Sequence, residues 1–293
     1  MDIGIGLPNA IQDVDGDSLV EFARRADRRG FSTLGTIDRI VYPNYEPLLA
    51  LAAAAAVTER IKLGTTILIT PYRPNATLLA KEALTLDHMS GGRLVLGVGI
   101  GARTDDYEVS GLPTEGRGAT LDRQLDQMKR VWEGEVTGFA GPVGPPAVRP
   151  GGPEVLVGGT VDAAFERAAK HGAGWILGGG GPDLFAQMAA KVEAAWQHAG
   201  RDGKPRKAQL AFFALGPHAQ ADIDGSIRDY YAWLGEFAAG IAGSVATSEE
   251  MVRSYLRAYE GAGCDELILF PSSKDPAQVD LLADAVGLGG SAQ

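Results

Sequence analysis

An alternation of short apolar strand patterns with helix patterns runs through the whole chain and constrains its fold most strongly. We count eight strand and helix pairs, and no Pro/Ser-rich linker separates them. Each strand pattern is apolar on both faces, which is typical of parallel strands covered by helices that form right-handed crossovers. Eight such pairs in 293 residues predict an α/β fold, a single TIM-type (β/α)8 barrel domain over residues 1–293, rather than an open sheet.

Two segments differ from this alternation and are expected to be loops or insertions. The segment 100–116 is long and polar, which predicts a binding loop over the strand ends. Residues 135–152 are rich in Pro and Gly and form either a surface arm or lid, or a mere spacer. We also expect one aromatic-rich helix over residues 222–240, and capping boxes that start helices at Ser18 and Thr247.

Composition and charge exclude several classes of function. The chain has 37 acidic and 27 basic residues and a net charge of −10, which argues against a nucleic-acid or anionic-membrane surface. No apolar run approaches the about 20 residues of a membrane span, and the N-terminus lacks a signal peptide's basic region, so we expect a cytoplasmic protein. The single Cys264 excludes an internal disulfide and a multi-thiolate metal site. The expected partner is a small molecule.

Glycine turns follow the fifth and sixth strand patterns. Gly158 and Gly159 end the fifth, and Thr160 follows where a helix N-cap belongs. A strand end, two residues without Cβ and a helix N-terminus place several free N–H groups around one point, which suits a phosphate. Residues 178–181 form a second turn, where backbone can approach a ligand closely. The alternative is that both are simply tight turns of an α/β protein.

The motifs of other enzyme classes are absent from the sequence. There is no G-x-S-x-G nucleophile elbow and no P-loop. The four histidines fall in predicted helix ends or loops away from the strand ends, so we expect no metal centre. A bound phosphorylated cofactor, such as a flavin, is therefore expected to carry the chemistry, while the barrel supplies position and electrostatics.

Several motifs together resemble the luciferase-like, flavin-dependent oxidoreductases. The most specific is LDHMSGGRLVLGVG with the DDYEVSG that follows it, and VGGT at the fifth strand supports the resemblance independently. The match covers most of the chain. It implies a (β/α)8 barrel that binds FMN or the deazaflavin coenzyme F420, and it implies a homodimer.

The resemblance also implies positions for the cofactor. Thr66 and Ile67 are expected to form a non-prolyl cis peptide behind the isoalloxazine ring, and glycines are expected near the phosphate. The cofactor-binding residues implied in this way are Thr66, Ile67, Gly99, Gly158, Gly159, Thr160, Gly178 and Gly179.

The chain departs from the family pattern at two positions. Many relatives carry Asp-His after the second strand, where this chain has Asp38 and Arg39, so the usual active-site histidine is absent. Deazaflavin-dependent sugar-phosphate dehydrogenases place a glutamate near Ala102, so that substrate class is not expected. Asp38 is our catalytic candidate; its alternative role is to hydrogen-bond backbone at the barrel rim. Arg39 or Arg103 is expected to meet an anionic cofactor tail or substrate. The remaining polar candidates are Asp105, Asp106 and Tyr107.

Our preferred hypothesis is hydride exchange between a reduced flavin or deazaflavin and a small organic substrate. The compact chain favours the deazaflavin reductases and dehydrogenases, which are often the smaller members of the family. An FMN monooxygenase that uses dioxygen is the second hypothesis. A non-catalytic flavin-binding barrel is the third, because the missing histidine permits it.

Overall fold

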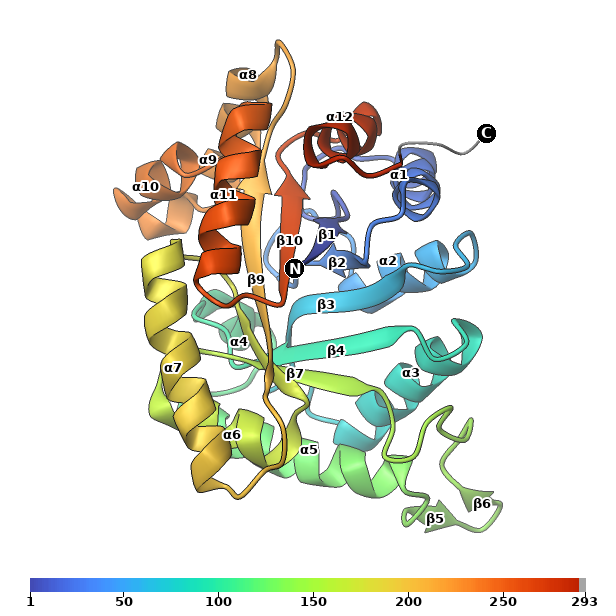
Figure 1. The fold of residues 1–293 in the computed structure, drawn as a ribbon. Coiled ribbons are helices and arrows are strands. Elements are labelled where there is room, and N and C mark those ends of the chain that lie inside the picture. The colour runs from blue at the N-terminus through green and yellow to red at the C-terminus, as the bar shows by residue number, and fades with distance from the viewer. Residues whose placement is uncertain (290–293) are drawn as a thin grey trace.

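Eight parallel strands close into a barrel within residues 1–289, the part of the chain that the computed structural model describes (Figure 1). Around the barrel the order is β1-β10-β9-β8-β7-β4-β3-β2. The predicted (β/α)8 fold is thus confirmed. The strands are β1 (Asp2–Gly6), β2 (Thr33–Thr36), β3 (Lys62–Ile69), β4 (Leu94–Gly99), β7 (Glu154–Gly158), β8 (Gly174–Leu177), β9 (Arg206–Phe213) and β10 (Glu266–Pro271).

Helices connect the strands and cover the outside of the barrel (Figure 1). The long ones are α1 (Gly16–Arg29), α2 (Pro47–Ala55), α3 (Ala76–Met89), α5 (Arg117–Trp132), α6 (Asp162–His171), α7 (Pro182–His198), α11 (Glu249–Gly261) and α12 (Ala277–Val286). Short ones are α4 (Asp105–Val109), α8 (Ala219–Gly225), α9 (Ile227–Tyr230), the 3-10 helix η1 (Ala232–Leu234) and α10 (Phe237–Gly243). None of the helices in residues 1–289 has the length and hydropathy of a membrane span.

Two apolar clusters fill the molecule. The larger lies between the strands and the helices, and the smaller includes Leu156, Ile176 and Phe270, which lie inside the barrel. At the strand starts, the Arg206 guanidinium forms ion pairs with the carboxylates of Glu154 and Glu266. Because side chains occupy the interior and this ion group closes the N-terminal end, the C-terminal mouth is left for a ligand, as in other barrels of this type.

The two segments expected to be loops take different forms. Residues 100–116 contain the short helix α4 and lie at the mouth. Residues 135–152 carry a small hairpin of β5 (Thr137–Gly138) and β6 (Gly141–Pro142). Lys81 Nζ donates to the Gly144 carbonyl over 2.6 Å, and Arg149 donates to the carbonyl of Leu94 at the start of β4. This second segment is therefore a surface arm anchored away from the mouth, and it is not a lid.

Three local predictions were wrong. Residues 222–240 form no single helix: α8, α9, η1 and α10 follow one another with breaks, one of them at Gly235, whose φ of 57° is left-handed. The side chain of Asp15, not Ser18, caps α1, because its Oδ1 accepts from the Ser18 N–H over 2.7 Å. Ser248, next to the predicted Thr247, caps α11.

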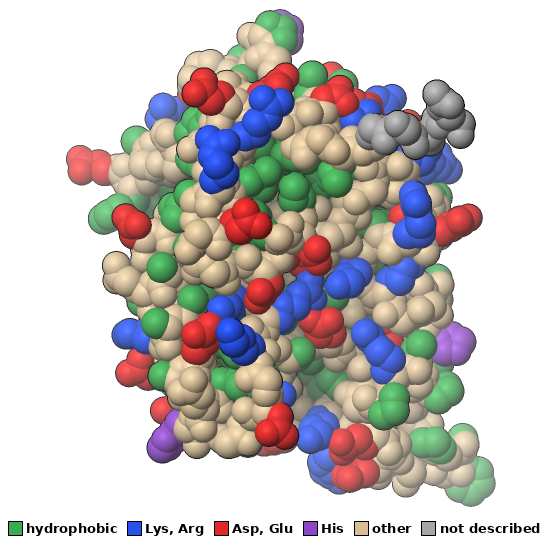
Figure 2. Space-filling view, viewed as in Figure 1, with side chains coloured by type: hydrophobic (Ala, Val, Ile, Leu, Met, Phe, Trp, Pro, Cys, Tyr) green, Lys and Arg blue, Asp and Glu red, His purple; other side chains and the backbone are tan. Residues whose placement is uncertain are grey.

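Charged side chains are mixed on the molecular surface. On the face shown in Figure 2, acidic and basic groups alternate over short distances. Neither sign forms a continuous patch on that face.

Candidate functional site

A cavity of about 510 Å³ opens at the C-terminal mouth of the barrel. Its size lies within the usual range for small-molecule and cofactor sites. The predicted catalytic and cofactor-binding residues all line it: Asp38, Thr66, Ile67, Gly99, Gly158, Gly159, Thr160, Gly178 and Gly179. Of the other polar candidates, Arg103, Asp106 and Tyr107 line it, whereas Arg39 and Asp105 do not. The fold therefore brings together residues from five strand ends, although their individual roles stay predictions.

Ile67 forms the floor of this cavity. The peptide bond between Thr66 and Ile67 is cis, as predicted, and the pairing of β3 with β4 shifts register at this point. A Cβ added to Gly158 would overlap the Ile67 Cδ1 atom, and one added to Gly99 would lie 3.0 Å from Ile67 Cγ2. These two glycines thus make room for a side chain of the protein itself, a reason that the sequence does not reveal.

The turn after β7 is built differently from the prediction. Thr160 is not the N-cap: α6 begins at Asp162, and the preceding Val161 supplies no side-chain cap, so its first N–H groups remain available to a ligand. Gly159 has φ of 144°, a conformation that favours glycine. Its carbonyl accepts a 2.7 Å hydrogen bond from Trp175 Nε1, which fixes the turn. This arrangement fits a phosphate at the α6 N-terminus.

The bond from Trp175 gives a first testable prediction. We expect Trp175→Phe to lower cofactor affinity several-fold, since losing one hydrogen bond costs about 1 kcal/mol and frees the Gly159 carbonyl. Trp196→Phe is the matched control, because Trp196 is also buried and donates to the Asp202 carbonyl, outside the cavity lining. Titrations with FMN and with F420 measure the cofactor affinity of both variants. Equal affinities would show that the turn does not depend on this hydrogen bond.

Asp38 is held by its neighbours at the end of β2. Its side chain is 1% exposed, its Oδ2 accepts from the Ile69 N–H over 2.8 Å, and its Oδ1 accepts from Arg73 Nη2 over 3.1 Å. Burial raises the pKa of the Asp38 carboxyl, and the Arg73 guanidinium opposes that shift. Arg73 also pairs with Glu46 over 3.0 Å. The carboxylate thus anchors the end of β3, the alternative considered from the sequence.

The loop after β4 reaches across to the loop after β2. Asp106 is buried, and its Oδ1 accepts from the N–H groups of Ile40 (3.0 Å) and Val41 (2.8 Å). Arg103 lies beside it, with Nε 3.3 Å from Asp106 Oδ2, and its Nη2 pairs with Asp105. Both loops together form one wall of the cavity.

The segment after β9 contributes an aromatic wall that sequence reasoning missed. The side chains of this wall that line the cavity are Tyr230, Tyr231 and Trp233. The Arg103 guanidinium lies over the Trp233 ring, with its Cζ 5.1 Å from the ring centroid. Arg39 Nη1 donates to the Tyr230 carbonyl over 2.7 Å, so it holds this wall in place. The aromatic content of residues 222–240 was the available signal, but a single helix was expected there.

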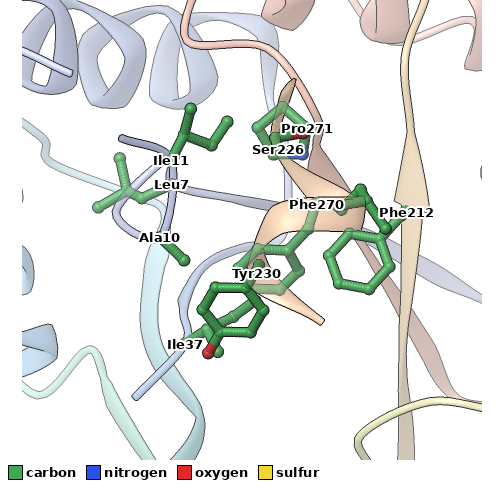
Figure 3. A pocket seen from close by; sticks show the side chains of 10 residues that line it. Leu7, Ala10, Ile11, Ile37, Phe212, Ser226, Tyr230, Phe270 and Pro271 are labelled. Carbon is green, nitrogen blue, oxygen red and sulfur yellow. The ribbon is translucent and has the colours of Figure 1, made fainter. Parts of the chain in front are cut away.

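A second cavity of about 20 Å³ lies behind this wall (Figure 3). Ile37 and Tyr230 line both cavities, and Figure 3 shows them side by side. Apart from the Ser226 and Tyr230 side chains its lining is apolar, and its volume is about that of one water molecule. It is too small for a cofactor, so the larger cavity is the candidate site. In residues 1–289, moreover, no group of three or more His, Cys, Asp or Glu side chains is placed to hold a metal ion.

Comparisons with known proteins show which family this chain resembles. A family model described as luciferase-like monooxygenase matches residues 1–267. The uncharacterized protein Rv0953c of Mycobacterium tuberculosis is 34% identical over 174 residues, which are 56% of this chain and 61% of that protein. An F420-dependent glucose-6-phosphate dehydrogenase of Kribbella flavida is 30% identical over 154 residues, 50% of this chain and 46% of that protein.

Among solved structures, the oxygenating constituent of 3,6-diketocamphane monooxygenase of Pseudomonas putida, a type II Baeyer-Villiger monooxygenase in complex with FMN, has a TM-score of 0.74. It is 19% identical, and the match covers 97% of this chain and 96% of that one. The similarity shows a shared fold. The region matched to Rv0953c spans less than two thirds of that relative's length.

Proposed function

Because this chain belongs to the luciferase-like monooxygenase family, we propose that it is an oxidoreductase that binds FMN or coenzyme F420 and exchanges hydride with a small organic substrate. One observation carries the proposal: a single cavity combines the Ile67 floor, the uncapped α6 N-terminus and an aromatic wall. When bound, the cofactor supplies the redox chemistry, and the chain supplies position and a dry environment.

Each part of the cavity has a proposed task. The N–H groups at the start of α6 and the turn at Gly178 and Gly179 would bind the phosphate. No atom lies within 4 Å of a Cβ built at Gly179, so this turn leaves open space for a ligand. Ile67 would support the flat ring from below. The aromatic wall would exclude water from the reacting face.

Two names among the relatives support different cofactors. The Kribbella flavida relative is named as F420-dependent, and it supports the deazaflavin hypothesis. The Pseudomonas putida structure is an FMN complex of a monooxygenase, and it supports the second candidate, an FMN monooxygenase that uses dioxygen.

A titration of the purified protein with FMN and with F420 tests the proposal. We expect one of them to bind with micromolar affinity or better, and the change in cofactor fluorescence measures this binding. Turnover of the reduced cofactor with and without dioxygen then separates the two candidates, because only the monooxygenase requires dioxygen. If neither cofactor binds, the proposed function is wrong; if a cofactor binds but no reduced form is ever consumed, the chain is a non-catalytic flavin-binding barrel.

A further inference from the structure

Arg103 has hydrogen-bonding capacity that the protein does not use. Its side chain is 11% exposed, and within residues 1–289 its Nη1 has no hydrogen-bond partner. Its Nε lies 3.3 Å from Asp106 Oδ2 but in a geometry that makes no hydrogen bond. A buried donor without a partner is costly, and a guanidinium N–H is a strong donor to anionic oxygen.

Two cations, Arg103 and Arg39, and two carboxylates, Asp105 and Asp106, lie close together at the mouth. Arg39 lies nearby and makes no ion pair with a carboxylate of the described residues. Burial lowers the pKa of the Arg39 guanidinium, and the charge of Arg103 lowers it further. Asp106 is buried, but it already accepts from two backbone N–H groups. Asp105 has a side chain that is 41% exposed, so its pairing with Arg103 is weakened by solvent. Arg103 thus contacts two carboxylates through Nη2 and Nε, while its Nη1 is left to an anionic oxygen from a ligand.

Contacts tie Arg103 to the side of the mouth away from β8. It follows β4, and through Asp106 its loop is tied to the loop after β2. The glycine turns that would hold the phosphate end β7 and follow β8, and β7 is the neighbour of β4 in the barrel. The Arg103 guanidinium instead lies over Trp233, which comes from the segment after β9 and spans the mouth.

We propose that Arg103 binds a carboxylate of the substrate, and that the substrate is a small organic acid whose flat apolar body lies against Trp233, Tyr231 and Leu210. This inference rests on the proposed function, since it names the substrate class of the same cavity. Arg39 acts behind the wall: it adds positive charge and fixes Tyr230, but it does not line the cavity.

Calorimetric titration with model ligands tests the proposal without turnover. The probes are benzoate and 2-naphthoate, each beside its neutral amide, added to the wild-type protein with and without bound cofactor. We expect each acid to bind at least about tenfold more tightly than its amide, as a charged hydrogen bond predicts. Arg103→Met, which keeps an apolar stem, should remove this preference, and Arg103→Lys should retain part of it.

Two further variants make the test specific. Arg123→Met removes the same charge from an exposed arginine of α5 and should leave the preference for acids unchanged. Asp105→Asn frees the Arg103 Nη2 group and should strengthen acid binding several-fold. Melting curves of all variants confirm that they are folded.

Three results would overturn the proposal: equal affinity for acid and amide, the same behaviour of Arg103→Met and Arg123→Met, or a loss of cofactor affinity in Arg103→Met as large as the loss of acid affinity. The last result would assign Arg103 to the cofactor. The cofactor titration of the wild type is separate, so a failure of the proposed function and a failure of the acid site are distinguishable.

Discussion

Replacing Gly159 by Glu is expected to lower cofactor affinity nearly a thousandfold. The new carboxylate would stand at the strand end beside the uncapped α6 N-terminus, where a phosphate is expected. Two like charges about 4 Å apart cost roughly 4 kcal/mol at an effective dielectric of 20, which corresponds to that loss. Titration of the purified variant with FMN and with F420 measures it.

The geometry at Gly159 requires controls that separate charge from shape. Its φ of 144° disfavours any side chain, and a Cβ there would lie 2.6 Å from the Cβ of Ala164. Even Gly159→Ala is therefore expected to weaken binding, although less than Glu, and Gly159→Ala with Ala164→Gly should recover part of the loss. Gly159→Gln has the bulk of Glu without its charge. If Gln and Glu variants bind the cofactor equally, the anion does not sit at this turn.

The fold was predictable because its signals repeat. Eight apolar strand patterns, each followed by a helix pattern, specify the barrel, and a barrel places strand ends together at one mouth. For that reason glycines and Asp38, which lie far apart in the sequence, could be assigned to one site before the cavity was seen. The cis bond at Thr66 was predicted from the family resemblance and not from residue chemistry.

The remaining features depend on contacts that a linear sequence does not show. Gly158 ends a strand beside the expected phosphate, but the nearest constraint on it is the Ile67 side chain of another strand. Thr160 has a favourable residue type for an N-cap, yet the helix starts two residues later. The aromatic wall was missed because one continuous helix was expected over residues 222–240, whereas α8 ends at Gly225 and the chain breaks again at Gly235, so Tyr230, Tyr231 and Trp233 line the mouth.

The contacts of Asp38 lead to the second large prediction. We expect Asp38→Ala to reduce the free energy of unfolding by about 3–5 kcal/mol, because it leaves the Arg73 guanidinium largely buried with only Glu46 as its ion-pair partner and the Ile69 N–H without an acceptor. Asp38→Asn should cost less, since its amide oxygen can still accept from Ile69. Urea unfolding followed by circular dichroism measures both.

A structural role and a catalytic role for Asp38 predict different patterns. If Asp38 positions the end of β3, the Asn variant should lose cofactor affinity and turnover together, and Arg73→Met should show similar losses. Combining Asp38→Ala with Arg73→Met should then cost less than the sum of the single changes, because the removed groups share one contact. An Asn variant that is as stable as wild type and binds cofactor normally, but has a kcat reduced a hundredfold, would instead identify Asp38 as the catalytic group, because its loss would then be confined to the reaction step.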